Sequence, residues 1–268
     1  MDFGRVLLLG GGNMGGAMAR GWLEGGLAPA DLTIVDPMGG PHVEAMVAAG
    51  ARHLTEPDAE PADILVLAVK PQVLGDALPA LRPVLTDATL IVSIVAGRTI
   101  ASIESVLGER PVVRAMPNTP ALIGRGITGA YAGTLVTVAQ REATTKLLQS
   151  CGPVEWVGSE AEIDAVTAVS GSGPAYVFHL TEALAAAGVK AGLEPALALR
   201  LARHTVAGAG ELMIRSAEEP AELRRNVTSP NGTTQAALEV LMGEGGFPSL
   251  LERAVEAARR RAGELSKG

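Results

Sequence analysis

The chain has 268 residues, of which 47% are hydrophobic and 19% are charged, a balance typical of a globular protein of one or two domains. A net charge of −7 and an aromatic content of only 3% argue against general binding to nucleic acids or membrane surfaces. The single cysteine excludes an internal disulfide, and neither a secretory leader nor a membrane-spanning run is evident, so we expect a cytoplasmic protein.

The first half of the chain alternates short apolar runs with segments of helical spacing. Runs that are apolar throughout and separated by helices predict a parallel sheet covered on both faces. We therefore predict an α/β fold with a Rossmann-type, doubly wound and mostly parallel sheet over residues 1–163. The predicted strands are Arg5–Gly10, Leu32–Asp36, Asp63–Pro71, Thr89–Gly97, Pro111–Pro120 and Pro153–Gly158.

After Asp164 no strand pattern remains, and residues 164–268 are predicted to form an all-α domain. The segments Pro174–Leu193 and Pro195–Ile214 are apolar on nearly every side, which is typical of helices that are buried all round. A small helical domain cannot cover both, so we expect a homodimer that forms through these helices. The alternative is a central helix inside one large monomeric domain.

The first predicted strand ends in a glycine-rich loop, Gly10–Gly15, that fits G-x-G-x-x-G and opens a helix. In this motif the first glycine permits a tight turn, the second lets the backbone approach a pyrophosphate, and the third allows close packing of helix and strand. The second strand ends in an aspartate 21 residues further on (36 − 15), where it can accept hydrogen bonds from a ribose. The alternative is an ordinary glycine-rich turn. The predicted dinucleotide-binding residues here are Gly10, Gly12, Asn13, Met14, Gly15 and Asp36.

Asp36 also bears on the choice of cofactor. A 2′-phosphate would meet its negative charge, and the segment Pro37–Pro41 contains no arginine or lysine to offset it. These residues therefore favour NADH over NADPH.

Three further strand ends carry small or kinked residues, in "AVKP" (Ala68–Pro71), "VAG" (Val95–Gly97) and "MPNTP" (Met116–Pro120). Ligands bind at the carboxyl ends of strands in such sheets, and small residues there let a ribose or nicotinamide lie on the backbone. Lys70 either reaches a ribose hydroxyl or caps the sheet edge, and Asn118 either orients a ligand or serves only the turn. The candidates are Ala68, Val69, Lys70, Pro71, Ala96, Gly97 and Asn118.

These motifs, together with "SGSGPAY" (Ser170–Tyr176) and "VTSPNGTT" (Val227–Thr234), occur in an order that resembles pyrroline-5-carboxylate reductase over essentially the whole chain. The resemblance implies reduction of the cyclic imine 1-pyrroline-5-carboxylate to L-proline, the last step of proline biosynthesis, with NADPH or NADH. It also implies a Rossmann domain, a helical dimerisation domain, and dimers that assemble further into decamers.

Three positions depart from the family's common pattern. Where the family has S-P-G-G-T-T, this chain has S-P-N-G-T-T, with Asn231 in place of the first glycine. Asparagine is the residue best able to replace glycine at positive φ, so we expect the turn to persist. An asparagine that often lies near the adenosine ribose corresponds to Thr55. Asp36 stands where many members have a serine or a basic residue, so it opposes the family's common preference for NADPH.

The segment Val227–Thr234 is a turn followed by a helix start, where free backbone N–H groups and the helix dipole suit an anion. We predict that the N–H groups of Thr233 and Thr234, next to Gly232, bind the substrate carboxylate. The resemblance supports a catalytic role for Thr234, whose hydroxyl would donate to the ring nitrogen. The alternative is that both threonines only cap the helix.

The stretch Ser170–Gly173 is predicted to form a small-residue turn before a buried helix, with Pro174 in its first turn. By resemblance it lies beside nicotinamide and substrate, with Ser172 binding the substrate and Asn226 contributing to the cofactor site. A plain N-cap is the alternative for this stretch. No spacing of Cys, His or Asp suggests a metal.

Two other functions are alternatives to this one. A reductase of the β-hydroxyacid dehydrogenase type would need an asparagine one turn after its catalytic lysine, and Lys190 has none there. A non-enzymatic redox sensor that binds a dinucleotide would not require "SPNGTT".

Overall fold

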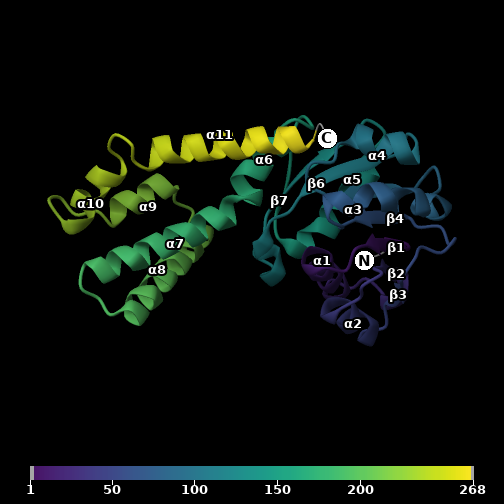
Figure 1. Cartoon of the computed structure of the whole chain (residues 1–268), viewed down its shortest axis with the longest axis horizontal. Coiled ribbons are helices and arrows are strands. Elements are labelled where there is room, and N and C mark those ends of the chain that lie inside the picture. The colour runs from purple at the N-terminus through teal and green to yellow at the C-terminus, as the bar shows by residue number, and fades with distance from the viewer. Residues whose placement is uncertain (1–2, 267–268) are drawn as a thin grey trace. The chain divides into compact units, whose positions relative to one another are not determined.

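The computed structural model describes residues 3–266, which form two compact units (Figure 1). The first unit contains the chain through Ser172 and also the C-terminal segment from Ala258 onward, and the second unit is Gly173–Ala257. The predicted domains, 1–163 and 164–268, divide the chain differently, because a short helix after residue 161 and the end of the last helix pack with the sheet.

Within the described residues, the first unit is built on an eight-stranded sheet with the order β3-β2-β1-β4-β5-β6-β7-β8. Neighbouring strands are parallel except for β6 and β7. The order reverses between β1 and β4, the switch point of a doubly wound sheet, which confirms the predicted fold class. The strands are β1 (Val6–Leu9), β2 (Leu32–Val35), β3 (Arg52–Leu54), β4 (Ile64–Leu67), β5 (Leu90–Ser93), β6 (Val112–Met116), β7 (Thr128–Ala132) and β8 (Val154–Trp156).

Helices connect and cover these strands. The α-helices of the first unit are α1 (Asn13–Glu24), α2 (Pro41–Ala48), α3 (Pro71–Ala77), α4 (Ile100–Leu107), α5 (Val138–Leu148) and α6 (Glu162–Val166). Its shorter segments are the 3₁₀ turns η1 (Pro29–Asp31), η2 (Leu78–Val84), η3 (Thr119–Ile123) and η4 (Gln149–Cys151), and the π-helical turn η5 (Thr167–Gly171).

Two apolar cores lie on opposite faces of the sheet. Along β1, Val6 and Leu8 join the core with α1, α2 and α5, whereas Leu7 and Leu9 join the core with α3, η2 and α4. Successive strand residues point to opposite faces, so a strand covered on both sides must be apolar throughout. This is why the continuous apolar runs predicted a parallel sheet.

The predicted strands overrun the observed ones at their carboxyl ends, and two strands were missed. The run Asp63–Pro71 is a strand only through Leu67, and Pro71 already begins α3. The missed strands are β3, three residues with an exposed arginine, and β7, whose "TGAYA" has little β-forming character. In β7, Gly129 is required by close packing, because a Cβ there would lie 2.5 Å from the Val166 side chain.

The second unit is all-helical, as predicted. It contains α7 (Gly173–Lys190), α8 (Pro195–Arg215), α9 (Pro220–Asn226), α10 (Thr233–Leu241) and most of α11 (Phe247–Leu265). Helices α7 and α8 pack on each other, yet α7 has no buried residue and α8 buries only Ala198 and Ala202. One chain therefore leaves the apolar faces of both helices uncovered, with Phe178 and Ile214 63% and 75% exposed.

Among the described residues, no helix combines the length and apolarity needed to cross a membrane.

Candidate active site

The glycine-rich loop between β1 and α1 has the geometry of a dinucleotide cradle. Gly10 has φ of 99°, and a Cβ on Gly15 would lie 2.1 Å from the Gly10 carbonyl oxygen, so these two glycines serve the turn and the helix packing. Gly12 differs, because a Cβ there would meet nothing within 4 Å. The loop is therefore open at Gly12, the position at which the motif lets a pyrophosphate approach.

The start of α1 faces this opening. Gly12 is the N-cap residue, and within residues 3–266 no side chain caps the helix. Its first residues, Asn13 and Met14, are exposed and half-buried, respectively. An uncapped helix start offers N–H groups and the positive end of the dipole, so it suits a pyrophosphate.

The Asp36 carboxylate is held toward the same loop by three backbone N–H groups. Gly11 donates to Oδ2 at 2.8 Å, and Met38 and Gly39 donate to Oδ1 at 2.9 and 3.2 Å. Thr55 is exposed directly after β3, beside the aspartate backbone, since Asp36 N–H donates to the carbonyl of Leu54. The carboxylate and the threonine thus lie at the carboxyl ends of neighbouring strands, the edge of such a sheet at which ligands bind.

The strand ends of β4 and β5 complete this edge of the sheet. Ala68 and Val69 pack against the first glycine of the loop, and the exposed Lys70 side chain makes no hydrogen bond or ion pair with the described residues. Arg98 Nη2 donates to the carbonyl of Pro71 at 3.2 Å and so joins the two strand ends. Ala96 and Gly97 follow β5 in the chain, just before Arg98, and both are half-buried.

Asn118 follows β6 and is 9% exposed. Its Oδ1 accepts a hydrogen bond from the Ile127 N–H at 3.0 Å, and its carbonyl accepts one from the Ala121 N–H. The amide oxygen therefore serves the turn, and any contact of this side chain with a ligand would come from its amide nitrogen.

The stretch Ser170–Gly173 is not the turn that the sequence predicted. It continues α6 as the π-helical turn η5, in which Ser170 Oγ donates to the Val166 carbonyl, and α7 begins at Gly173. Small residues predict a turn here, yet the backbone of Ser170 and Gly171 is helical, and a Cβ on Gly171 would make only ordinary van der Waals contact with Met116 at the end of β6. π-Helical turns are frequent at functional sites. Ser172, the candidate substrate residue, directly follows this turn.

In the second unit, the helix start at α10 has the predicted shape. Asn231 has φ of 57°, the only positive φ of a non-glycine residue between positions 3 and 266, so the turn persists with asparagine. Gly232 is the N-cap residue, and Thr233 and Thr234 are the first two helical residues, with no side-chain cap in the described chain. The idea that these threonines only cap the helix is therefore wrong, because they lie inside it.

Asn226 ends α9, where its Nδ2 donates to Glu218 at 3.1 Å. Its side chain is thus paired with a residue of the second unit. The other candidates that lie in this unit are Gly232, Thr233 and Thr234. The candidates of the first unit lie at the carboxyl ends of its parallel strands, apart from Ser172, which follows η5.

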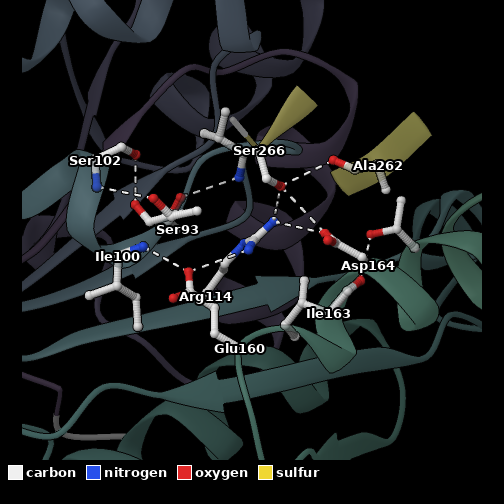
Figure 2. Close-up of polar contacts among 12 residues, drawn as sticks. Ser93, Ile100, Ser102, Arg114, Glu160, Ile163, Asp164, Ala262 and Ser266 are labelled. Atoms are coloured by element: carbon white, nitrogen blue, oxygen red, sulfur yellow. Dashed lines mark hydrogen bonds and ion pairs between the residues drawn. The ribbon is translucent and has the colours of Figure 1, made fainter. Parts of the chain in front are cut away.

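One polar cluster escaped the sequence analysis. Arg114 is buried in β6 and contacts Glu160, Asp164 and Ser266 (Figure 2). The one signal for it was an arginine inside the apolar run "VVRAM", because a charge in a doubly covered strand needs buried partners.

The open glycine loop, the uncapped helix and the carboxylate of Asp36 bound to that loop, on a doubly wound sheet, define a nicotinamide dinucleotide-binding oxidoreductase of the Rossmann type. A family model described as pyrroline-5-carboxylate reductase dimerisation matches residues 160–265, and one described as NADP oxidoreductase, coenzyme F420-dependent, matches residues 5–97. The chain belongs to the pyrroline-5-carboxylate reductase family, which confirms the resemblance seen in the sequence motifs.

Individual relatives cover the whole chain. The pyrroline-5-carboxylate reductase of Pseudomonas aeruginosa is 46% identical over 100% of this chain and 98% of the relative, and that of Corynebacterium melassecola is 38% identical over 98% of each. The solved structure of the Coxiella burnetii enzyme matches with a TM-score of 0.91 at 34% identity, covering 100% of both chains. The Plasmodium falciparum enzyme, solved with NADP bound, matches with a TM-score of 0.84 at 30% identity over 99% of both.

Proposed function

We propose that this protein catalyses the NAD(P)H-dependent reduction of 1-pyrroline-5-carboxylate to L-proline, the last step of proline biosynthesis. The observation that carries the proposal is the uncapped start of α10, with Asn231 at positive φ and two threonines in the first helical turn. A dinucleotide cradle alone fits many reductases. A second anion-binding helix start gives this chain a place for a small carboxylate substrate.

The first unit would bind the cofactor through its pyrophosphate, at Gly12 and the first turn of α1, and through its ribose at Asp36. When bound, the reduced nicotinamide supplies the hydride. The strand ends at Ala68–Pro71 and Ala96–Gly97 would orient the ring, and we also place Thr55, Asn118 and Asn226 among the cofactor contacts. For Asn118 and Asn226, the contact would come from atoms that make no hydrogen bond within the protein.

The second unit would bind the substrate. Backbone N–H groups of Thr233 and Thr234 suit the carboxylate, and the Thr234 hydroxyl would donate to the ring nitrogen. That nitrogen gains electron density as hydride reaches the neighbouring carbon, so the hydrogen bond strengthens in the transition state. Thr234 is half-buried, and its hydroxyl has no hydrogen-bond partner among the described residues, so it is available for this role.

We infer that NADH is used at least as well as NADPH. The Asp36 carboxylate is fixed by three backbone N–H groups, so it cannot turn away without breaking them. A 2′-phosphate at the ribose would be repelled by this charge.

We further propose a homodimer that forms through α7 and α8, in the cytoplasm, with dimers that can assemble into decamers. The apolar faces that one chain leaves exposed on these helices support the dimer.

The direct test is the oxidation of NADH or NADPH in the presence of 1-pyrroline-5-carboxylate, with proline identified as the product. We expect turnover with both cofactors and none when the imine is omitted. Cofactor binding without any turnover of this imine would contradict the proposed reaction and leave a reductase with another substrate, or a sensor.

A further inference from the structure

A buried arginine lies next to the strand end that carries Ala96 and Gly97. The Arg114 side chain, on β6, is 3% exposed, and its Nη1 lies 3.3 Å from Glu160 Oε1. Its Nη2 lies 3.6 Å from Asp164 Oδ1 and 3.4 Å from Ser266 Oγ. Figure 2 shows the three partners pointing at the guanidinium, Glu160 and Asp164 from the stretch around the start of α6 and Ser266 from the C-terminal segment. We call Arg114, Glu160, Asp164 and Ser266 the arginine cluster.

The cluster reaches the cofactor-binding edge through Glu160. The same Oε1 that faces Arg114 accepts a hydrogen bond from the Ile100 N–H at 2.8 Å. Ile100 is the first residue of α4, and Thr99 caps that helix by accepting from the Ser102 N–H. Glu160 therefore serves as a second cap for α4, supplied from 60 residues away, and its negative charge faces the positive end of the helix dipole.

The C-terminal segment forms a second contact with this strand end. Gly97 has φ of 68°, and a Cβ there would lie 2.8 Å from the Leu265 Cβ. The next residue, Ser266, has its hydroxyl within 3.4 Å of both Arg114 and Asp164. The backbone from Val95 to Ile100 is thus fixed at Ile100 by Glu160 and covered at Gly97 by the end of α11.

Stability alone does not account for such a cluster. Buried ion pairs contribute little net stability compared with apolar packing, and the Nε of Arg114 has no hydrogen-bond partner among the described residues. What the arginine does is hold the Glu160 carboxylate, 28% exposed, at one place beside the start of α4. Arg114 therefore acts on the position of the loop before α4, the segment Val95–Ile100.

We propose that Arg114 and Glu160 are positioning residues for cofactor binding, which act by fixing the segment Val95–Ile100. This inference rests on the proposed cofactor role of Ala96 and Gly97. Neither side chain needs to touch the cofactor, because Glu160 acts through the Ile100 N–H and Arg114 acts through Glu160.

The test compares three variants by NADH fluorescence titration without substrate, at temperatures well below each melting point. Glu160→Ala removes the acceptor at Ile100 and should raise the Kd for NADH about tenfold, as expected for loss of a charge-assisted hydrogen bond. Glu160→Gln keeps an oxygen at that place and should recover most of the affinity. Glu162→Ala is the matched control, since Glu162 is exposed at the start of α6, just after Glu160, and among the described residues its carboxylate accepts only from Gly158 and Ser159.

A second measurement needs no cofactor. In Glu160→Ala the amide of Ile100 and the segment 95–99 should exchange hydrogen faster than in wild type, while β1 and β4 keep their protection. If Glu160→Ala lowers only the melting temperature, with wild-type Kd and wild-type exchange at Ile100, the inference is overturned. Equal losses in the glutamine and alanine variants would also overturn it, since the acceptor would then not matter.

These results are separable from the proposed reaction. A wild-type protein that binds NADH but does not reduce the imine would contradict the proposed function and leave the binding comparison intact.

Discussion

Gly11 donates its backbone N–H to Asp36 Oδ2 at 2.8 Å, which links the dinucleotide loop directly to the end of the second strand. The other carboxylate oxygen accepts from Met38 and Gly39, so both oxygens are engaged by backbone that cannot supply a positive charge. A cofactor placed in this loop would therefore meet a negative charge of fixed position.

The first prediction concerns cofactor preference. Unit charges about 4 Å apart near a protein surface repel by about 4 kcal/mol, so we expect Asp36→Asn to raise kcat/KM with NADPH about tenfold or more. Asparagine keeps one oxygen for the backbone donors, and NADH should be affected less. Asp31→Asn, an exposed aspartate just before the start of the same strand, is the control. A wild type that strongly prefers NADPH would show that Asp36 does not set the choice.

The second prediction separates two glycines of the same loop. Gly12→Ala adds a Cβ into open space at φ of −67°, so the melting temperature should stay unchanged while NADH affinity falls. Gly15→Ala places a Cβ 2.1 Å from the Gly10 carbonyl oxygen, and such overpacking commonly destabilises by about 1–3 kcal/mol. Calorimetry of the free proteins and NADH titration check both. Unchanged affinity in Gly12→Ala would mean that the pyrophosphate does not approach there.

The third prediction concerns the threonines of α10. Thr234→Val removes the proposed donor at nearly constant volume, and kcat should fall by about 10²-fold, the lower end for loss of a polarising group. Thr233→Val, the matched control, keeps the backbone N–H and should change kcat far less. Neither change should lower stability by the roughly 1 kcal/mol of a lost cap, because Gly232 holds the N-cap position. Normal kcat in Thr234→Val would remove this hydroxyl from the mechanism.

The fourth prediction concerns assembly. Light scattering should show a dimer or a multiple of it at micromolar concentration, since obligate interfaces commonly bury upwards of about 2,000 Å². Phe178→Asp, on α7, should yield monomers or insoluble protein. Val138→Asp changes an apolar residue on α5 that is even more exposed and should leave the assembly intact. An active, well-folded wild-type monomer would contradict this prediction.

The sheet could be predicted because burial on both faces forces its strands to be apolar without interruption, as β1 and β4 show. The strand β7 could not, because its glycine and alanines are dictated by side chains that reach it from elsewhere, such as Val166 against Gly129. The stretch Ser170–Gly173 could not be predicted either, because its small residues are typical of a turn whereas the backbone continues as a π-helical turn through Gly171 and starts α7 at Gly173. Local sequence does not distinguish these causes from a turn.

The candidate site also contains some features that the local sequence predicts and others that it does not. The glycine loop, Asp36 and the turn at Asn231 follow from local rules of backbone conformation, and the structure has them in the expected geometry. The arginine cluster does not, because its members are separated by up to 152 residues and only the tertiary fold brings them together.

The return of the C-terminal segment to the first unit has a consequence for synthesis in the cell. Chains generally fold from the N-terminus while they are being made. Here Ser266, which contacts Arg114, lies 152 residues further along the chain, and Leu265 covers Gly97 from the same segment. The dinucleotide-binding unit therefore cannot complete its packing until the whole helical unit between them has been made, and a nascent chain that carries only the sheet should bind the cofactor more weakly than the chain that includes Ser266.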